Sequence, residues 1–108
     1  MNKIRVIIKR PDEEYGHVTY ISDKLENLQK YVGGNIEIVE IGSKGAVMIC
    51  NEEGKIHGLP CNCIIPNDYL VGEIIVFGTK GDEFDDIPIT RPEWKKILAD
   101  WGNSECRE

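Results

Sequence analysis

The sequence predicts an α+β fold: a mostly antiparallel sheet of about five to six strands, with one helix after the second strand and an amphipathic C-terminal helix. Short apolar segments bounded by Gly, Pro and Asn indicate the strands, and two segments with helical spacing indicate the helices. A chain of 108 residues has room for one hydrophobic core. We therefore expect a single domain over residues 1–108, with residues from about 103 to 108 loose.

The first two strands are expected to pair. Ile4, Val6 and Ile8 alternate with other residues, which is the period of a half-buried strand. Residues 11–16 form a polar turn, and residues 17–21 are rich in β-branched and aromatic side chains. We expect this second strand to return antiparallel to the first.

The first helix is expected to start at Ser22, because a serine hydroxyl is a good N-cap. Leu25, Leu28 and Val32 then recur on one helical face. Gly33, followed by a second glycine, provides a left-handed end to the helix. The helix is expected to pack its apolar face onto the sheet.

The middle of the chain predicts a hairpin and a central strand. Residues 35–41 alternate and then slip phase at Val39, which indicates a bulge or burial on both faces. Residues 42–45 have the composition of a hairpin loop. Residues 46–50 are apolar throughout, as expected of a strand covered on both faces.

The following segments are harder to assign. Residues 51–54 are expected to form a tight turn with Gly54 at positive φ, and residues 55–57 a short return strand. Residues 63–71 are ambiguous, with a turn at Pro66-Asn67-Asp68. Residues 73–77 are an apolar strand, and residues 78–86 are expected to be a mobile acidic loop.

The C-terminal helix has the clearest signals in the sequence. Thr90 and Glu93 have the spacing of a capping box, and Gly102 is placed to end the helix. Four apolar residues follow the cap at positions i, i+3, i+4 and i+7, namely Trp94, Ile97, Leu98 and Trp101. This pattern predicts an amphipathic helix.

Charge and composition exclude several function classes. The net charge of −6 argues against binding to duplex nucleic acid, which needs clustered Lys and Arg. No segment has the roughly 18 to 20 apolar residues of a membrane helix, and the N-terminus lacks a signal peptide. We therefore expect a cytoplasmic protein without membrane association, whose four cysteines are mostly free thiols.

The segment 51–62 is the best candidate for a functional site. It gathers Gly, Pro, Asn, His and Cys between two apolar strands, and loops carry function more often than core residues do. Its asparagines each offer a donor and an acceptor, although capping a nearby turn is the commoner role of any one asparagine. The predicted ligand-binding residues are Asn51, Glu52, Lys55, His57, Leu59, Pro60 and Asn62, with aromatic walls from Tyr31 and Trp94 and also Tyr69.

Residues 32–37 (VGGNIE) and 51–62 (NEEGKIHGLPCN) carry a family resemblance. There the sequence resembles the small family called domain of unknown function 3846, over roughly residues 3 to 80. The resemblance implies a compact protein of bacteriophages, plasmids or Gram-positive bacteria, and so a location in the host cytoplasm. The family loop commonly has Asn-Arg where this chain has Asn62-Cys63, so another cation such as Lys55, His57 or Arg91 would have to replace that arginine.

Two catalytic or metal-binding alternatives are weaker. His57, Cys61 and Cys63, with Cys50 or Cys106 as a fourth ligand, suggest zinc, but the spacing lacks a Cys-x2-Cys knuckle. Cys61 with His57 as base would need contact and an orienting group. The acidic residues Asp82, Glu83, Asp85 and Asp86 lack the spacing of a calcium loop. We therefore expect no cofactor, no metal and no catalytic residue.

The predicted function is binding without catalysis. From the resemblance, the first expectation is an accessory protein of a phage or mobile element that sequesters a small nucleotide-type signal of host defence, with the pocket formed in a homo-oligomer. The alternative is an acidic inhibitor of a host defence or DNA-binding enzyme. It would act through Asp12, Glu13, Glu14 and residues 82–86.

Overall fold

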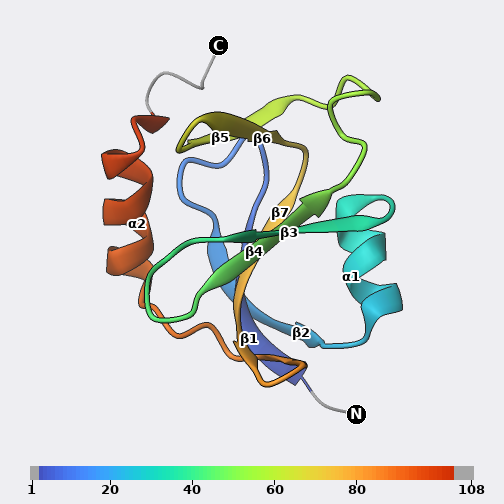
Figure 1. Cartoon of the computed structure of the whole chain (residues 1–108), viewed down its shortest axis with the longest axis vertical. Coiled ribbons are helices and arrows are strands. Elements are labelled where there is room, and N and C mark those ends of the chain that lie inside the picture. Colours follow the sequence, from blue (N-terminus) through green and yellow to red (C-terminus); the bar gives the residue numbers. More distant parts are fainter. Residues whose placement is uncertain (1–2, 104–108) are drawn as a thin grey trace.

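A computed structural model describes residues 3–103 as eight strands and two helices (Figure 1). The elements in chain order are β1 (Lys3–Lys9), β2 (His17–Ser22), α1 (Leu25–Val32), β3 (Ile36–Glu40), β4 (Val47–Asn51), β5 (Cys61–Ile65), β6 (Asp68–Val71), β7 (Ile74–Lys80), β8 (Glu83–Asp85) and α2 (Arg91–Asp100). The α+β prediction is confirmed, including both helix positions. Residues 104–108, most of the segment predicted to be loose, lie outside the described residues.

The main sheet is antiparallel and has six strands. Its order is β2-β1-β7-β4-β3, and β8 pairs with β7. The predicted pairing of the first two strands is confirmed, with Lys3 opposite Ser22 and Ile8 opposite His17. Every residue of β4 is buried, as the unbroken apolar run predicted, because β4 lies between β7 and β3. A separate two-stranded hairpin is made by β5 and β6.

Each face of the sheet has its own core. Leu28 and Val32 of α1 pack on one face with a cluster that includes Ile49 and Phe77. On the other face, Trp94 and Leu98 of α2 join residues of the β5–β6 hairpin. Figure 1 shows α1 and α2 on opposite sides of the sheet. The sheet is therefore covered on both faces, which explains the unbroken apolar run from Val47 to Cys50 in β4.

The two helices begin differently. The capping box of α2 is confirmed: Thr90 accepts from the Glu93 amide at 3.2 Å, and Glu93 accepts from the Thr90 amide at 2.8 Å. The predicted Ser22 cap of α1 is wrong, because the N-cap is Lys24, whose side chain makes no capping bond. Ser22, which lies three residues before the first residue of α1, instead accepts from the Lys24 amide. Gly33 ends α1 at φ 83°, as predicted.

Three further expectations are corrected. Residues 55–57 form turns and not a strand. The expected mobile loop at residues 78–86 contains the end of β7 and all of β8, where Phe84 packs edge-on against Phe77 with ring centroids 4.8 Å apart. The expected bulge or two-sided burial at Val39 is absent from β3, which pairs in unbroken register with β4 and is largely exposed. Within residues 3–103, no helix has the length and apolar character needed to cross a bilayer.

Candidate functional site

The two asparagines of the segment 51–62 are buried and bonded to backbone. Asn51 donates from Nδ2 to the Val32 carbonyl at 3.1 Å and accepts the Glu53 amide on Oδ1 at 2.7 Å. It thereby fixes the end of α1 to the start of the loop. Asn62 donates to the carbonyls of Lys9 and Gly72, at 2.8 and 2.7 Å. The bond from Glu53 to Asn51 is a local turn contact of the kind common for asparagine, whereas the other three bonds join segments distant in the sequence. Both side chains therefore hold the fold together.

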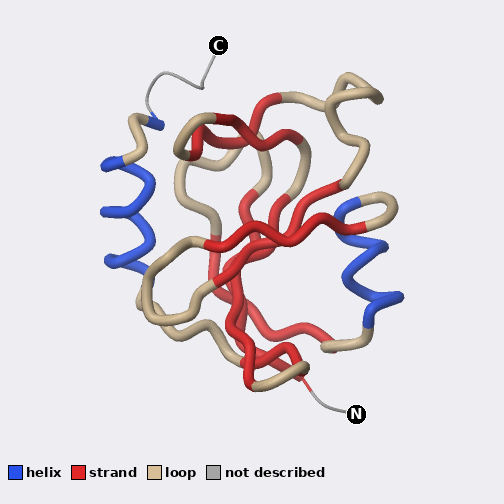
Figure 2. The backbone as a smooth tube through the Cα atoms, in the orientation of Figure 1, coloured by secondary structure: helices blue, strands red, loops and turns tan. Residues whose placement is uncertain are grey.

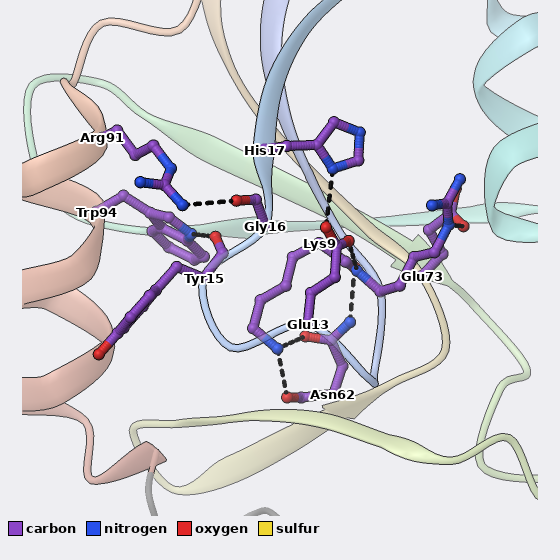
Figure 3. Close-up of polar contacts among 10 residues, drawn as sticks. Lys9, Glu13, Tyr15, Gly16, His17, Asn62, Glu73, Arg91 and Trp94 are labelled. Atoms are coloured by element: carbon purple, nitrogen blue, oxygen red, sulfur yellow. Dashed lines mark hydrogen bonds and ion pairs between the residues drawn. The ribbon is translucent and has the colours of Figure 1, made fainter.

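Asn62 also accepts hydrogen bonds from a buried lysine (Figure 3). The ammonium of Lys9 donates to the Asn62 carbonyl oxygen and to Oδ1, both at 3.0 Å, and Lys9 is only 2% exposed. The β5–β6 register shifts between Cys61 and Cys63, so Asn62 lies at a bulge that turns its side chain toward β1. This pair of residues fastens the hairpin to the main sheet.

The loop between β4 and β5, drawn in tan in Figure 2, contacts β6 and the residue after it closely at Gly54 and Leu59, although most of its side chains are exposed. A Cβ at Gly54 would lie 2.7 Å from a methyl carbon of Val71, and one at Gly72 would lie 2.8 Å from Leu59. Gly54 is therefore needed for close approach, and the positive φ predicted for it is not observed. The loop is held against β6 and forms one wall of a groove.

That groove, called here the hairpin groove, lies between the β3–β4 end of the sheet and the β5–β6 hairpin. It has a volume of about 480 Å³, within the usual range for ligand sites. Buried Cys50, Ile65, Leu70 and Val71 line it, together with the exposed side chains of Ile56 and Tyr69. Ile56 is 81% exposed, which is unusual for isoleucine. The groove thus offers apolar surface to solvent.

The charged residues of the hairpin groove are mostly acidic. Glu37, Glu52, Glu53 and Asp68 line it, with Lys55 as the cation among the lining residues. Lys55 is bound to Asp68 at 2.5 Å and lies 4.3 Å from the centroid of the Tyr69 ring. The hydrogen bond from Lys55 lowers the pKa of Asp68, and the same bond raises the pKa of Lys55. Both groups therefore stay charged at neutral pH, and the groove is acidic as a whole.

The remaining predicted residues are distributed over several places. Tyr31, Leu59 and Pro60 line a second, shallower hollow. His57 is exposed and has Nε2 3.7 Å from Glu53. Trp94 is fully buried and donates from Nε1 to the Tyr15 carbonyl at 3.0 Å. Of the ten predicted residues, the structure brings together Asn51, Glu52, Lys55 and Tyr69 in the hairpin groove, whereas Asn62 lines a cavity beside Lys9.

Neither free thiol is activated. Cys50 and Cys63 are free and buried. Burial raises the pKa of Cys50 to about 11, with a further contribution from Glu37, and burial raises the pKa of Cys63 to about 12. Both therefore stay protonated at neutral pH, whereas nucleophiles and metal ligands are thiolates. Within the described part of the chain, no three His, Cys, Asp or Glu residues are grouped to hold a metal ion. Cys106, a possible fourth ligand by sequence, lies outside that part.

The two acidic stretches through which the inhibitor alternative would act lie far apart. Asp12, Glu13 and Glu14 follow the end of β1, whereas residues 82–86 lie beside its start, where Asp86 accepts from the Arg5 amide at 2.8 Å. Figure 1 shows these regions at opposite ends of the sheet. Glu13 is moreover paired with His17 at 2.9 Å. The hairpin groove, by contrast, brings four carboxylates together around apolar surface.

Sequence reasoning missed Glu37 and Asp68 because they belong to strands and not to the segment 51–62. Each reaches the groove only through long-range packing of β3 and β6. Lys9 was also missed, since a lysine at the end of an apolar strand normally reaches solvent. The one local signal was Ile56, an apolar residue among turn-forming neighbours.

Comparison with known proteins identifies the family. The family model described as "Domain of unknown function (DUF3846)" matches residues 4–99. Searches of curated proteins and of solved structures gave no significant match. The family match extends beyond residue 80, the approximate end of the resemblance described from the sequence, and includes most of α2. The chain therefore belongs to the DUF3846 family.

Proposed function

We propose that this chain is a non-enzymatic binding protein whose partner is a protein that places basic and apolar side chains in the hairpin groove. One observation carries the proposal: an apolar, solvent-accessible groove is bordered by four carboxylates and by one lysine that is already paired. Complementary charge favours encounter with a basic surface and disfavours an acidic one. A basic surface, such as that of a DNA-binding enzyme, has the required chemistry.

A nucleotide-type ligand fits this groove less well. Its base could pack against Tyr69, but its phosphates would lie among Glu37, Glu52 and Glu53. Without a pocket of arginine or lysine side chains, those phosphates would lose hydration without gaining charge-assisted hydrogen bonds. The charge of the groove thus favours the protein partner over the sequestered nucleotide, and the two ligands respond oppositely to a change in that charge.

Reversal of the groove charge tests the proposal. The variant Glu37→Lys/Glu53→Lys should bind a peptide of alternating arginine and valine at least about tenfold more weakly than the native chain, because it adds like-charge repulsion. The affinity of the native chain should fall as salt is added. Titration calorimetry measures both effects.

The matched control is Glu26→Lys/Asp82→Lys, which changes the net charge equally at exposed positions of α1 and the β7–β8 turn. Its affinity for the peptide should change by less than about threefold. ATP is titrated in parallel. The proposal would be contradicted if the native chain did not bind the peptide and the groove variant bound ATP more tightly than the native chain did. That result would favour a nucleotide ligand.

A further inference from the structure

The outer edge of β3 lies along the hairpin groove. Three consecutive residues of this strand, Glu37, Ile38 and Val39, line the groove. In a strand, consecutive side chains point to opposite faces, so one groove can meet all three only by running along the strand edge. Val39 packs with the core on the α2 side, which places Glu37 on that side too and Ile38 on the α1 side.

The backbone of β3 directs alternate peptide groups toward that edge. The amide of Ile41 donates to the carbonyl oxygen of Ala46 at 3.0 Å, and the amide of Glu52 donates to the carbonyl oxygen of Asn35 at 2.8 Å. In antiparallel pairs, hydrogen-bonded and non-hydrogen-bonded residues alternate. Residues 35, 37, 39 and 41 therefore turn their peptide groups toward β4, and Ile38 and Glu40 turn theirs outward. Within residues 3–103, β3 ends the strand order, so no further strand covers these groups.

We infer that the partner is bound as an extended segment that adds a strand to the outer edge of β3 and places alternate basic side chains against Glu37 and its acidic neighbours in the hairpin groove. This inference rests on the proposed function and specifies the form of the partner. Backbone hydrogen bonds to Ile38 and Glu40 would supply affinity. Contacts between the groove and alternate side chains of the bound segment would supply specificity. The acidic edge disfavours a second copy of this chain, whose β3 carries the same charges.

Amide hydrogen exchange on the full chain tests the inference. Saturation with the arginine–valine peptide should slow exchange of the Ile38 and Glu40 amides by at least about tenfold, since added strands protect the amides they pair with. Amides of β2, the opposite edge of the sheet, serve as the control and should be unchanged. Protection in the unliganded protein that rises with protein concentration would instead indicate pairing between copies, and would overturn the inference.

The variant Ile38→Pro provides a second test. Proline is tolerated at edge positions whose amide faces away from the ladder, so β3 should remain paired with β4. The variant removes one outward donor and should bind the peptide about tenfold more weakly. The control Ile38→Thr also changes the side chain but keeps the amide and the β-propensity, so a further loss of affinity in Ile38→Pro relative to Ile38→Thr measures the missing donor.

Peptides methylated on backbone nitrogens test strand addition with the native chain, and so do not depend on whether Ile38→Pro folds. Methylation of backbone nitrogens on the edge that pairs with β3 should weaken binding to the native chain about tenfold. Methylation on the other edge should have no effect. Equal binding of both peptides, with no amide protection, would refute strand addition. If the groove charge reversal still abolished binding in that case, the proposed function would stand.

Discussion

Replacement of Asn62 by leucine is expected to lower the free energy of unfolding by about 3–5 kcal/mol, because it leaves a buried charge without one of its acceptors. Leucine has a similar volume, so packing changes little. It would, however, remove the Oδ1 acceptor of the Lys9 ammonium and the donor to the carbonyls of Lys9 and Gly72. Urea denaturation followed by circular dichroism measures the loss.

A double-mutant cycle with Lys9→Met identifies the source of that loss. If the buried ammonium causes much of it, adding Lys9→Met to Asn62→Leu should restore stability, with a coupling energy of about 2 kcal/mol. Additive losses from the two changes would mean that the Lys9–Asn62 contact contributes little. Asn62→Leu would then act only through the backbone carbonyls.

Replacement of Trp94 by alanine is expected to destabilise the chain by about 3–5 kcal/mol, the usual cost of deleting a large aromatic side chain from a core. Trp94 is fully buried, and its ring lies edge-on to Trp101 with centroids 6.1 Å apart. Thermal unfolding measures the effect. A loss of stability of this size would identify Trp94 as a core residue, whereas a small loss would fit the ligand-contacting aromatic that the sequence suggested.

The variant Trp94→Phe is the control for that assignment. It keeps an aromatic ring in the core but removes the hydrogen bond to the Tyr15 carbonyl, so a loss of about 1–3 kcal/mol is expected. Its affinity for the arginine–valine peptide should equal that of the native chain, because Trp94 is not one of the residues that line the hairpin groove. Loss of binding with intact stability would place Trp94 in the site after all.

The fold could be predicted from local patterns to the extent that those patterns reflect burial. The capping box at Thr90, the glycine that ends α1 and the apolar run of β4 are local signals of stable elements, and all were confirmed. The β8 strand was missed because its neighbours Thr79 and Lys80 are exposed and carry no apolar alternation. Its pairing with β7 depends on tertiary context.

The site could be predicted only in part, because the sequence does not show which side of a loop faces a groove. The segment 51–62 does border the hairpin groove, through Glu52 and Lys55. Its asparagines, chosen for their donors and acceptors, use them on nearby backbone. Glu37 and Tyr69 come from strands on either side of that segment, and their convergence follows from the placement of the hairpin on the sheet.

Photo-crosslinking at matched tyrosines tests the location of the partner site most directly. Tyr69 lies in the hairpin groove and Tyr20 on the opposite edge strand β2, and both are exposed, at 46% and 60%. Each is replaced separately by p-benzoylphenylalanine, and the chain is irradiated with the arginine–valine peptide. We expect an adduct at position 69 that the Glu37→Lys/Glu53→Lys change abolishes, and no adduct at position 20. An adduct at position 20 with none at position 69 would contradict the hairpin groove as the binding site.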